Sequence, residues 1–266
     1  MGRSTQPTPE SAGSDPAICI NELIEPPYVK TIDVCLTPAL LSQHDVREKV
    51  VVVVDILRAT STMVTAFAHG MAAIRPVAQV EECRALQHQG YLTAGERDGI
   101  KIEDFDFGNS PFDYQQDALR GKSLAMTTTN GTVAIEQAKG ARELIIGAFL
   151  NIRAVRDHIR QQEHDVLVVC AGWKGHVNLE DTLFAGALLT DVSPEWQAGS
   201  DAALLAKTLY TQAQTDCLGF LAQSAHVQRL GKMGLQRDIE FCLGRNVYPV
   251  VPRLRGEQLV VPAGQP

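Results

Sequence analysis

The segment Val50–Thr62, VVVVVDILRATST, decides the fold class of this chain. Successive side chains of a strand point to opposite faces, so five consecutive valines do not suit a strand with one face in water. They predict a strand buried on both faces, as in a parallel sheet covered by helices. The residues that follow, up to Gly70, predict a helix closed by that glycine.

Asp55, Arg58 and a run of hydroxyl residues stand between this strand and this helix. Ligands of open α/β sheets bind beyond the carboxyl ends of the strands. A helix that begins there points its free N–H groups and the positive end of its dipole at the same place. The segment therefore predicts a site for an oxyanion and a metal ion. The alternative is a strand end with a capping Asp or Thr and a surface arginine.

Segments typical of strands and helices alternate along most of the chain, which predicts a three-layer α/β/α fold with a mainly parallel or mixed sheet. Strands are expected at residues 28–36, 50–54, 73–77, 91–94, 122–128, 143–147 and 165–170. Helices are expected at residues 80–89, 133–138, 151–160, 179–189, 201–220, 224–230 and 235–242. We expect a disordered N-terminal tail over residues 1–27, a single catalytic domain over residues 28–255 and a C-terminal tail over residues 256–266.

Composition excludes several classes of function. The formal net charge of −7 argues against general nucleic-acid binding, because no basic excess is present to neutralise phosphates. None of the six cysteines forms a CxxC pair or has zinc-site spacing, which favours a reducing setting. The sequence shows neither a secretory signal nor an apolar run of the roughly 20 residues that a membrane span needs. A cytoplasmic protein without nucleic-acid or membrane partners is expected.

Three further polar clusters follow predicted strands, and each has a structural alternative. The TTTNGT segment ending at Thr132 fits a hairpin turn, but the helix-like VAIEQA after it favours a loop whose backbone N–H groups hold an anion. The segment Asn178–Asp181 fits either a capping box or a carboxylate ligand of Mg²⁺. Glu96 and Arg97 fit a solvated turn or a site, and His176 is the one histidine retained as a possible site residue.

Several motifs, in this order, resemble the 2-phosphosulfolactate phosphatase family (ComB). They are VDILRATSTMVTAFAHG, GERDGIKIEDFDFGNSP, TTTNGT, FLN, CAGWKGHVNLEDTLFAG and the C-terminal SAHVQRLGKMGLQRDIEFC. The resemblance covers about residues 30 to 252. It implies a Mg²⁺-dependent phosphomonoesterase that converts 2-phospho-3-sulfolactate to 3-sulfolactate and phosphate, a step of coenzyme M biosynthesis in archaea.

Residues and resemblance together assign the following site. The expected catalytic residues are Asp55, Arg58 and Glu96. The expected Mg²⁺ ligands are Asp55, Glu96, Glu180 and Asp181. The expected contacts to a small anionic phosphorylated substrate are Thr60, Ser61, Thr62, Arg97, Asn109, Ser110, Thr129, Asn130, Gly131, Thr132 and Lys174. A water is expected to attack in line, with Asp55 or Glu96 as metal ligand or base.

Two other functions stay open. One is a Mg²⁺-dependent phosphatase of another small phosphorylated acid, because sulfonate and carboxylate recognition cannot be separated by sequence. The other is a non-catalytic module that binds an anionic metabolite. The chain also leaves open whether the protein is a monomer or a homodimer.

Overall fold

The structure is a computed structural model that describes residues 1–2 and 29–262. The predicted N-terminal tail, residues 1–27, lies outside the described residues apart from the first two. Eleven strands form one sheet in the order β5-β4-β6-β3-β11-β10-β7-β2-β8-β1-β9. Their bounds are β1 (Thr31–Cys35), β2 (Val50–Val54), β3 (Ala73–Pro76), β4 (Leu92–Arg97), β5 (Ile100–Lys101), β6 (Ser123–Thr127), β7 (Glu143–Gly147), β8 (Val166–Cys170), β9 (Gln197–Ala198), β10 (Arg253–Arg255) and β11 (Gln258–Val260).

The valine strand β2 lies inside the sheet, parallel to β7 on one side and to β8 on the other. All five valines are at most 1% exposed, so both faces of β2 are covered. The prediction of a buried parallel strand is therefore confirmed.

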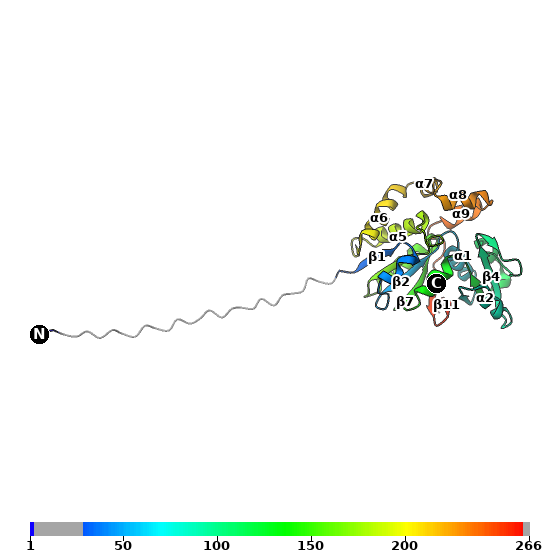
Figure 1. Cartoon of the computed structure of the whole chain (residues 1–266), viewed down its shortest axis with the longest axis horizontal. Coiled ribbons are helices and arrows are strands. Elements are labelled where there is room, and N and C mark those ends of the chain that lie inside the picture. The colour runs from blue at the N-terminus through cyan, green and yellow to red at the C-terminus, as the bar shows by residue number, and fades with distance from the viewer. Residues whose placement is uncertain (3–28, 263–266) are drawn as a thin grey trace.

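Helices pack over both faces of the sheet, which confirms the three-layer α/β/α fold (Figure 1). Helix α1 contacts β7, α5 contacts β8, and α6 contacts β1 and α5, while α3 contacts β2. The bounds are α1 (Ala59–Ala68), α2 (Val80–Gln87), α3 (Gly131–Gln137), α4 (Ile152–Arg160), α5 (Leu179–Val192), α6 (Asp201–Ala213), α7 (Cys217–Leu221), α8 (Ala225–Lys232) and α9 (Gln236–Cys242). Short 3-10 helices are η1 (Pro38–Gln43), η2 (Pro111–Tyr114), η3 (Asp117–Leu119) and η4 (Phe149–Asn151).

The helical region expected over residues 201–220 is two helices. Helix α6 ends at Ala213, and α7 begins after Asp216, whose carboxylate accepts a hydrogen bond from the Gly219 backbone N–H at 2.8 Å. This side-chain cap starts a new helix in a different direction. None of the described helices is both long and apolar enough to cross a lipid bilayer.

A C-terminal hairpin joins two groups of parallel strands. Strands β9, β1, β8, β2 and β7 form one group, and β3, β6 and β4 form the other. Strand β10 pairs antiparallel with β7, and β11 pairs antiparallel with β3, where Leu259 faces Ile74. Residues 258–260 of the expected C-terminal tail are therefore part of the sheet, where Leu259 is fully buried, while residues 263–266 lie outside the described residues. A three-residue strand is too short to show a hydrophobic period in the sequence.

The twist of the sheet explains why loops from both groups meet at one place. The antiparallel hairpin gives the two groups formally opposite directions within the sheet. Neighbouring strands rotate by about 20–25°, so the six steps from β2 to β4 accumulate a rotation of roughly 120–150°. The carboxyl ends of the two groups therefore come close together, next to helix α8.

Candidate active site

A polar pocket opens where the loops after β2, β4, β6 and β8 meet helix α8. It encloses about 310 Å³, its open mouth included. It is lined by Asp55, Leu57, Arg58, Glu96, Gly99, Asn109, Thr129, Asn130, Trp173, His226, Arg229 and Leu230. The structure therefore brings together the strand-end loops that the sequence singled out, and adds α8 from a distant part of the chain.

Asp55 sits at the junction of β2 and α1, in the floor of the pocket. Its Oδ1 accepts a hydrogen bond from the Ala59 backbone N–H at 3.3 Å, and its own N–H donates to the Thr60 hydroxyl at 3.0 Å. Burial raises the pKa of Asp55 to about 6; nearby His226 lowers the pKa, and the Glu96 and Glu180 carboxylates raise it further. Asp55 is thus a carboxylate whose pKa lies close to neutrality.

Gly131 allows the loop after β6 to approach Asp55. A Cβ atom at this position would lie 2.7 Å from the Ala59 Cβ and 2.8 Å from the Asp55 Oδ2. Thr132 next to it is buried, and its hydroxyl accepts from the Thr128 N–H at 3.0 Å and donates to the Thr128 carbonyl at 3.1 Å. Gly131 and Thr132 therefore close the loop against Asp55 rather than line the pocket.

The three hydroxyl residues of α1 differ from the prediction. Thr60, Ser61 and Thr62 are fully buried. Their hydroxyls donate to the carbonyls of Asp55 at 3.0 Å, Ile56 at 2.8 Å and Asn109 at 3.2 Å. They hold the loop in shape beneath the pocket, because a short side-chain hydroxyl at a helix start readily bonds to nearby backbone groups.

Glu96 lines the pocket, but both of its oxygens are already engaged. Oε1 accepts from the Thr129 N–H at 2.7 Å, and Oε2 accepts from the Gly99 N–H at 2.6 Å. The carboxylate links the loop after β4 to the loop after β6. Asp55, by contrast, accepts a hydrogen bond from the described residues on Oδ1 alone.

Asp181 is also engaged by backbone groups. Its Oδ1 accepts from the Ile56 N–H at 2.8 Å, and its Oδ2 accepts from the Gly172 N–H at 3.1 Å. Asn178 caps helix α5 by accepting from the Asp181 N–H at 3.4 Å. Burial raises the pKa of Asp181 well above its ordinary value, and the charges of Asp55 and Glu180 add to the rise. Asp181 ties the loops after β2 and β8 together from below.

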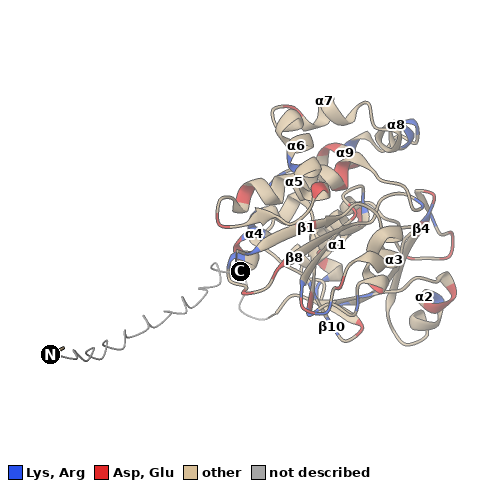
Figure 2. Cartoon of the chain, turned by 60° about the vertical axis from the view of Figure 1, so that its left-hand side comes forward, with Lys and Arg blue, Asp and Glu red and all other residues tan. Residues whose placement is uncertain are grey.

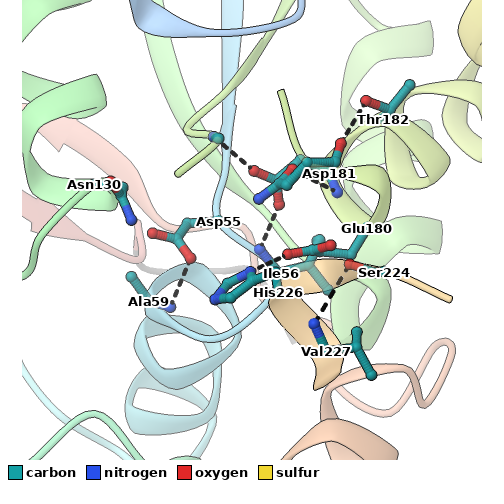
Figure 3. Close-up of polar contacts among 12 residues, drawn as sticks. Asp55, Ile56, Ala59, Asn130, Glu180, Asp181, Thr182, Ser224, His226 and Val227 are labelled. Atoms are coloured by element: carbon teal, nitrogen blue, oxygen red, sulfur yellow. Dashed lines mark hydrogen bonds and ion pairs between the residues drawn. The ribbon is translucent and has the colours of Figure 1, made fainter. Parts of the chain in front are cut away.

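Glu180 and His226 form a buried pair beside Asp55 (Figure 3). The Glu180 Oε1 lies 2.5 Å from the His226 Nδ1. The Oε2 of Glu180 is buried and has no hydrogen-bond partner within residues 29–262. The sequence did not single out His226, although it lies in the C-terminal motif of the family resemblance.

The basic residues near the pocket have different partners. Arg58 pairs with the buried carboxylate of Asp238. Lys174 pairs with Asp98 at 2.6 Å. The Arg97 Nη2 donates to the Ala78 carbonyl at 3.3 Å and the Thr127 hydroxyl at 3.0 Å, so Arg97 turns away from the pocket lining.

The remaining predicted substrate contacts are distributed around the pocket. Ser110 donates to Asp238 at 3.0 Å and so supports Arg58 indirectly. Asn130 accepts from the Lys174 backbone N–H at 2.9 Å and lines the pocket with Thr129. Asn109 also lines it, and its buried Oδ1 has no partner in the described part of the chain. His176 lines a neighbouring, more apolar pocket that shares Trp173, His226 and Arg229 with this one.

The four expected metal ligands do not form one cage. Over residues 1–2 and 29–262, no group of three or more His, Cys, Asp and Glu side chains stands close enough to hold a metal ion. Glu96 and Asp181 use both oxygens on backbone N–H groups. Asp55 and Glu180 are the two expected ligands that keep an oxygen without a hydrogen bond from the described residues.

A buried acid, a carboxylate-bound histidine, Arg58 at the carboxyl end of a strand and Arg229 of helix α8 define an α/β enzyme site for a small anion. The chain matches the family model described as 2-phosphosulpholactate phosphatase over residues 35–257, and it belongs to this family of phosphatases. This confirms the resemblance seen in the sequence.

Curated relatives agree with the family match. A "Probable 2-phosphosulfolactate phosphatase" of Pseudothermotoga lettingae is 39% identical over 222 residues, which cover 83% of this chain and 94% of the relative. Relatives with the same name occur in Clostridium novyi, at 35% identity over 83% of this chain and 95% of the relative, and in Clostridium acetobutylicum, at 36% identity over 86% and 99%. The similarity thus spans nearly the whole of each relative.

Proposed function

We propose that this protein is a Mg²⁺-dependent phosphatase that hydrolyses 2-phospho-3-sulfolactate to 3-sulfolactate and phosphate. The names of the family and of its relatives support the substrate. The pocket supports the chemistry. The observation that carries the proposal is the placement of Asp55, a buried carboxylate with a pKa near 6, in one pocket with Arg58 and His226.

Asp55 is proposed as the general base. A carboxylate with a pKa of about 6 is ionised at neutral pH and is a stronger base than an ordinary aspartate. It would orient a water for in-line attack on phosphorus and accept the proton of that water. Arg58 would bind phosphate oxygens through the guanidinium N–H groups that Asp238 leaves free.

His226 is proposed as the proton donor to the leaving group. The Glu180 carboxylate lies against Nδ1 and fixes the orientation of the ring, which leaves Nε2 as the nitrogen that would carry the donated proton. A proton from Nε2 to the bridging ester oxygen would release the hydroxyl group of 3-sulfolactate. Such proton transfer is needed because an alkoxide is a poor leaving group.

The residues present fit a Mg²⁺ ion that takes part of its shell from substrate and water. Mg²⁺ is commonly held by only one or two protein carboxylates. Glu180 would hold the ion through its buried Oε2, which has no hydrogen-bond partner among the described residues, and Asp55 would stay free to act as the base. When bound, Mg²⁺ neutralises negative charge on the phosphate group.

The test is phosphate release from 2-phosphosulfolactate with Mg²⁺ and with EDTA, alongside phosphoglycolate and phospholactate. Metal-dependent release that favours the sulfonate is expected. Release from the other acids alone would keep the chemistry and replace the substrate. No release from any of them would contradict the enzyme proposal and favour an anion-binding module.

Asp55→Asn tests the base in the same assay. Loss of a general base lowers rates by about 10²–10⁴-fold, and the fold of the variant is checked by circular dichroism. Asp104→Asn is the matched control, because Asp104 pairs with Arg84 on the surface at 2.7 Å. A near-normal rate for Asp55→Asn would contradict the assignment of Asp55 as the general base.

A further inference from the structure

Arg229 on helix α8 is held rigidly at the side of the pocket. Its guanidinium lies over the Trp173 ring, 4.6 Å from the ring centroid, and its Nη1 donates to the Asp98 carbonyl at 3.2 Å. The side chain lines both the polar pocket and the neighbouring, more apolar one. An arginine on an aromatic face keeps its planar N–H groups in a fixed direction.

Arg229 also differs from the other basic groups of the pocket lining and rim because it is not paired with a carboxylate. Arg58 has Asp238 as a partner, and Lys174 has Asp98. Arg229 has no carboxylate within 4.0 Å in the part of the chain that the structure describes. Figure 2 shows the basic colouring of α8 at the upper edge of the molecule, close to the loops around β4. A half-buried guanidinium without an ion-paired carboxylate is suited to an anionic ligand.

The geometry leaves a specific part of Arg229 free. Nη1 uses one of its two N–H groups on the Asp98 carbonyl, and the edge formed by Nε and Nη2 keeps both of its N–H groups. This is one of the two edges with which a guanidinium binds a pair of oxygens. Sulfonate and carboxylate groups both present such a pair of oxygens. The phosphate has other donors in Arg58 and the groups around Asp55.

We propose that Arg229, positioned by Trp173, is the specificity-determining residue that binds the acidic group of the substrate that is not hydrolysed, its sulfonate or carboxylate. This inference rests on the proposed function, since it concerns the same pocket and the same class of phosphorylated acid. The alternative is that Arg229 binds the phosphate itself.

The experiment compares two ligands that each carry one half of the substrate. Inhibition constants of 3-sulfolactate, which lacks the phosphate, and of inorganic phosphate are measured against 2-phosphosulfolactate turnover for the wild type and for Arg229→Gln. We expect the constant for 3-sulfolactate to rise about 10–100-fold in Arg229→Gln, the size typical of a lost charged hydrogen bond, and the constant for phosphate to change less than about 2-fold. KM for 2-phosphosulfolactate should rise with it, and kcat should change less.

Arg237→Gln is the matched control, because Arg237 also stacks on an aromatic ring, that of Phe112, at 3.8 Å, and is not part of the pocket lining. Trp173→Leu, which removes the platform but keeps the charge, should give a smaller rise for 3-sulfolactate. Thermal unfolding confirms that each variant is folded.

The outcomes separate this inference from the proposed function. Equal rises for 3-sulfolactate and phosphate would assign Arg229 to the phosphate and overturn the inference while the phosphatase stands. Unchanged constants for both ligands would overturn it as well. If the wild type neither hydrolyses 2-phosphosulfolactate nor binds 3-sulfolactate by calorimetry, both the inference and the proposed substrate are wrong.

Discussion

Two glutamates of this protein each hold a histidine, but in opposite surroundings. Glu143 of β7 binds His158 of α4 at 2.8 Å, with Arg253 and Arg255 of the C-terminal hairpin at 3.5 and 3.8 Å. Glu180 of α5 binds His226 of α8 at 2.5 Å and keeps an oxygen without a partner among the described residues. The first pair is surrounded by positive charge, and the second by carboxylates.

The pKa values reflect this difference. Burial alone would raise the pKa of Glu143, but the hydrogen bond from His158 and the charges of His158, Arg253 and Arg255 outweigh it and lower the pKa. In the pocket, burial and mutual repulsion raise the pKa of both Asp55 and Asp181. A balanced pair stabilises the fold, whereas an unbalanced cluster costs stability and is typical of a functional site.

Glu180→Gln removes the carboxylate of the pair in the pocket and has the largest expected effect. We expect kcat to fall by about 10²-fold or more, because His226 loses the carboxylate that orients it. The Mg²⁺ concentration for half-maximal rate should rise. The unfolding temperature should stay equal or increase, since a buried negative charge beside two others is removed. A variant with normal kcat would show that the pair is structural.

Glu143→Gln is the same substitution at the balanced pair, and it should act on stability alone. The free energy of unfolding should fall by about 1.5–3 kcal/mol, the usual contribution of a charged hydrogen bond. Urea unfolding measures this loss, and phosphate release should be unchanged. Loss of activity without loss of stability would contradict the structural role of this pair.

Lowering the pH should change the contributions of Asp55 and Glu143 to stability in opposite directions. This is the smallest of the expected effects. Because the pKa of Asp55 is raised to about 6 in the folded protein, the folded protein binds a proton more tightly than the unfolded chain between the ordinary aspartate pKa and about pH 6. Lowering the pH from 7 to 5 should therefore stabilise the metal-free wild type relative to Asp55→Asn by about 1.3 kcal/mol. The lowered pKa of Glu143 has the opposite sign: its contribution is present above the ordinary glutamate pKa and is lost as the pH falls through the folded value. Unfolding curves at several pH values in EDTA would check both signs.

The sequence was most informative where one residue type decides the local structure. Five adjacent valines require a covered strand, and the Asn178 side chain caps a helix as its position suggests. The sequence does not show whether a carboxylate binds a metal ion or supports the loops, because this depends on neighbours from other loops. Glu96 and Asp181 look like free carboxylates in the sequence, yet backbone N–H groups occupy all their oxygens, and for each carboxylate one of the two donors comes from a distant loop.

The roles of His226 and of the hydroxyl residues after Asp55 were also not predictable, because they depend on how the chain packs. His226 has no local signal, since its partner Glu180 is 46 positions earlier and they meet only when α8 folds over the sheet. Thr60 and its two neighbours were expected to bind substrate because a hydroxyl run at a strand end suits an anion. In the structure the same hydroxyls donate to the carbonyls of Asp55 and Ile56 in their own loop and of Asn109 in another loop.

The hairpin β10–β11 has a consequence for how this molecule is made. It bridges two strand groups whose loops form the pocket, but it is synthesised after all of their strands. Its pairing of Leu259 with Ile74 joins positions far apart in the chain, a type of contact that forms slowly during folding. The emerging chain therefore leaves the facing edges of β3 and β7 unpaired until residues 253–260 have been synthesised, and only then can the hairpin join the two strand groups.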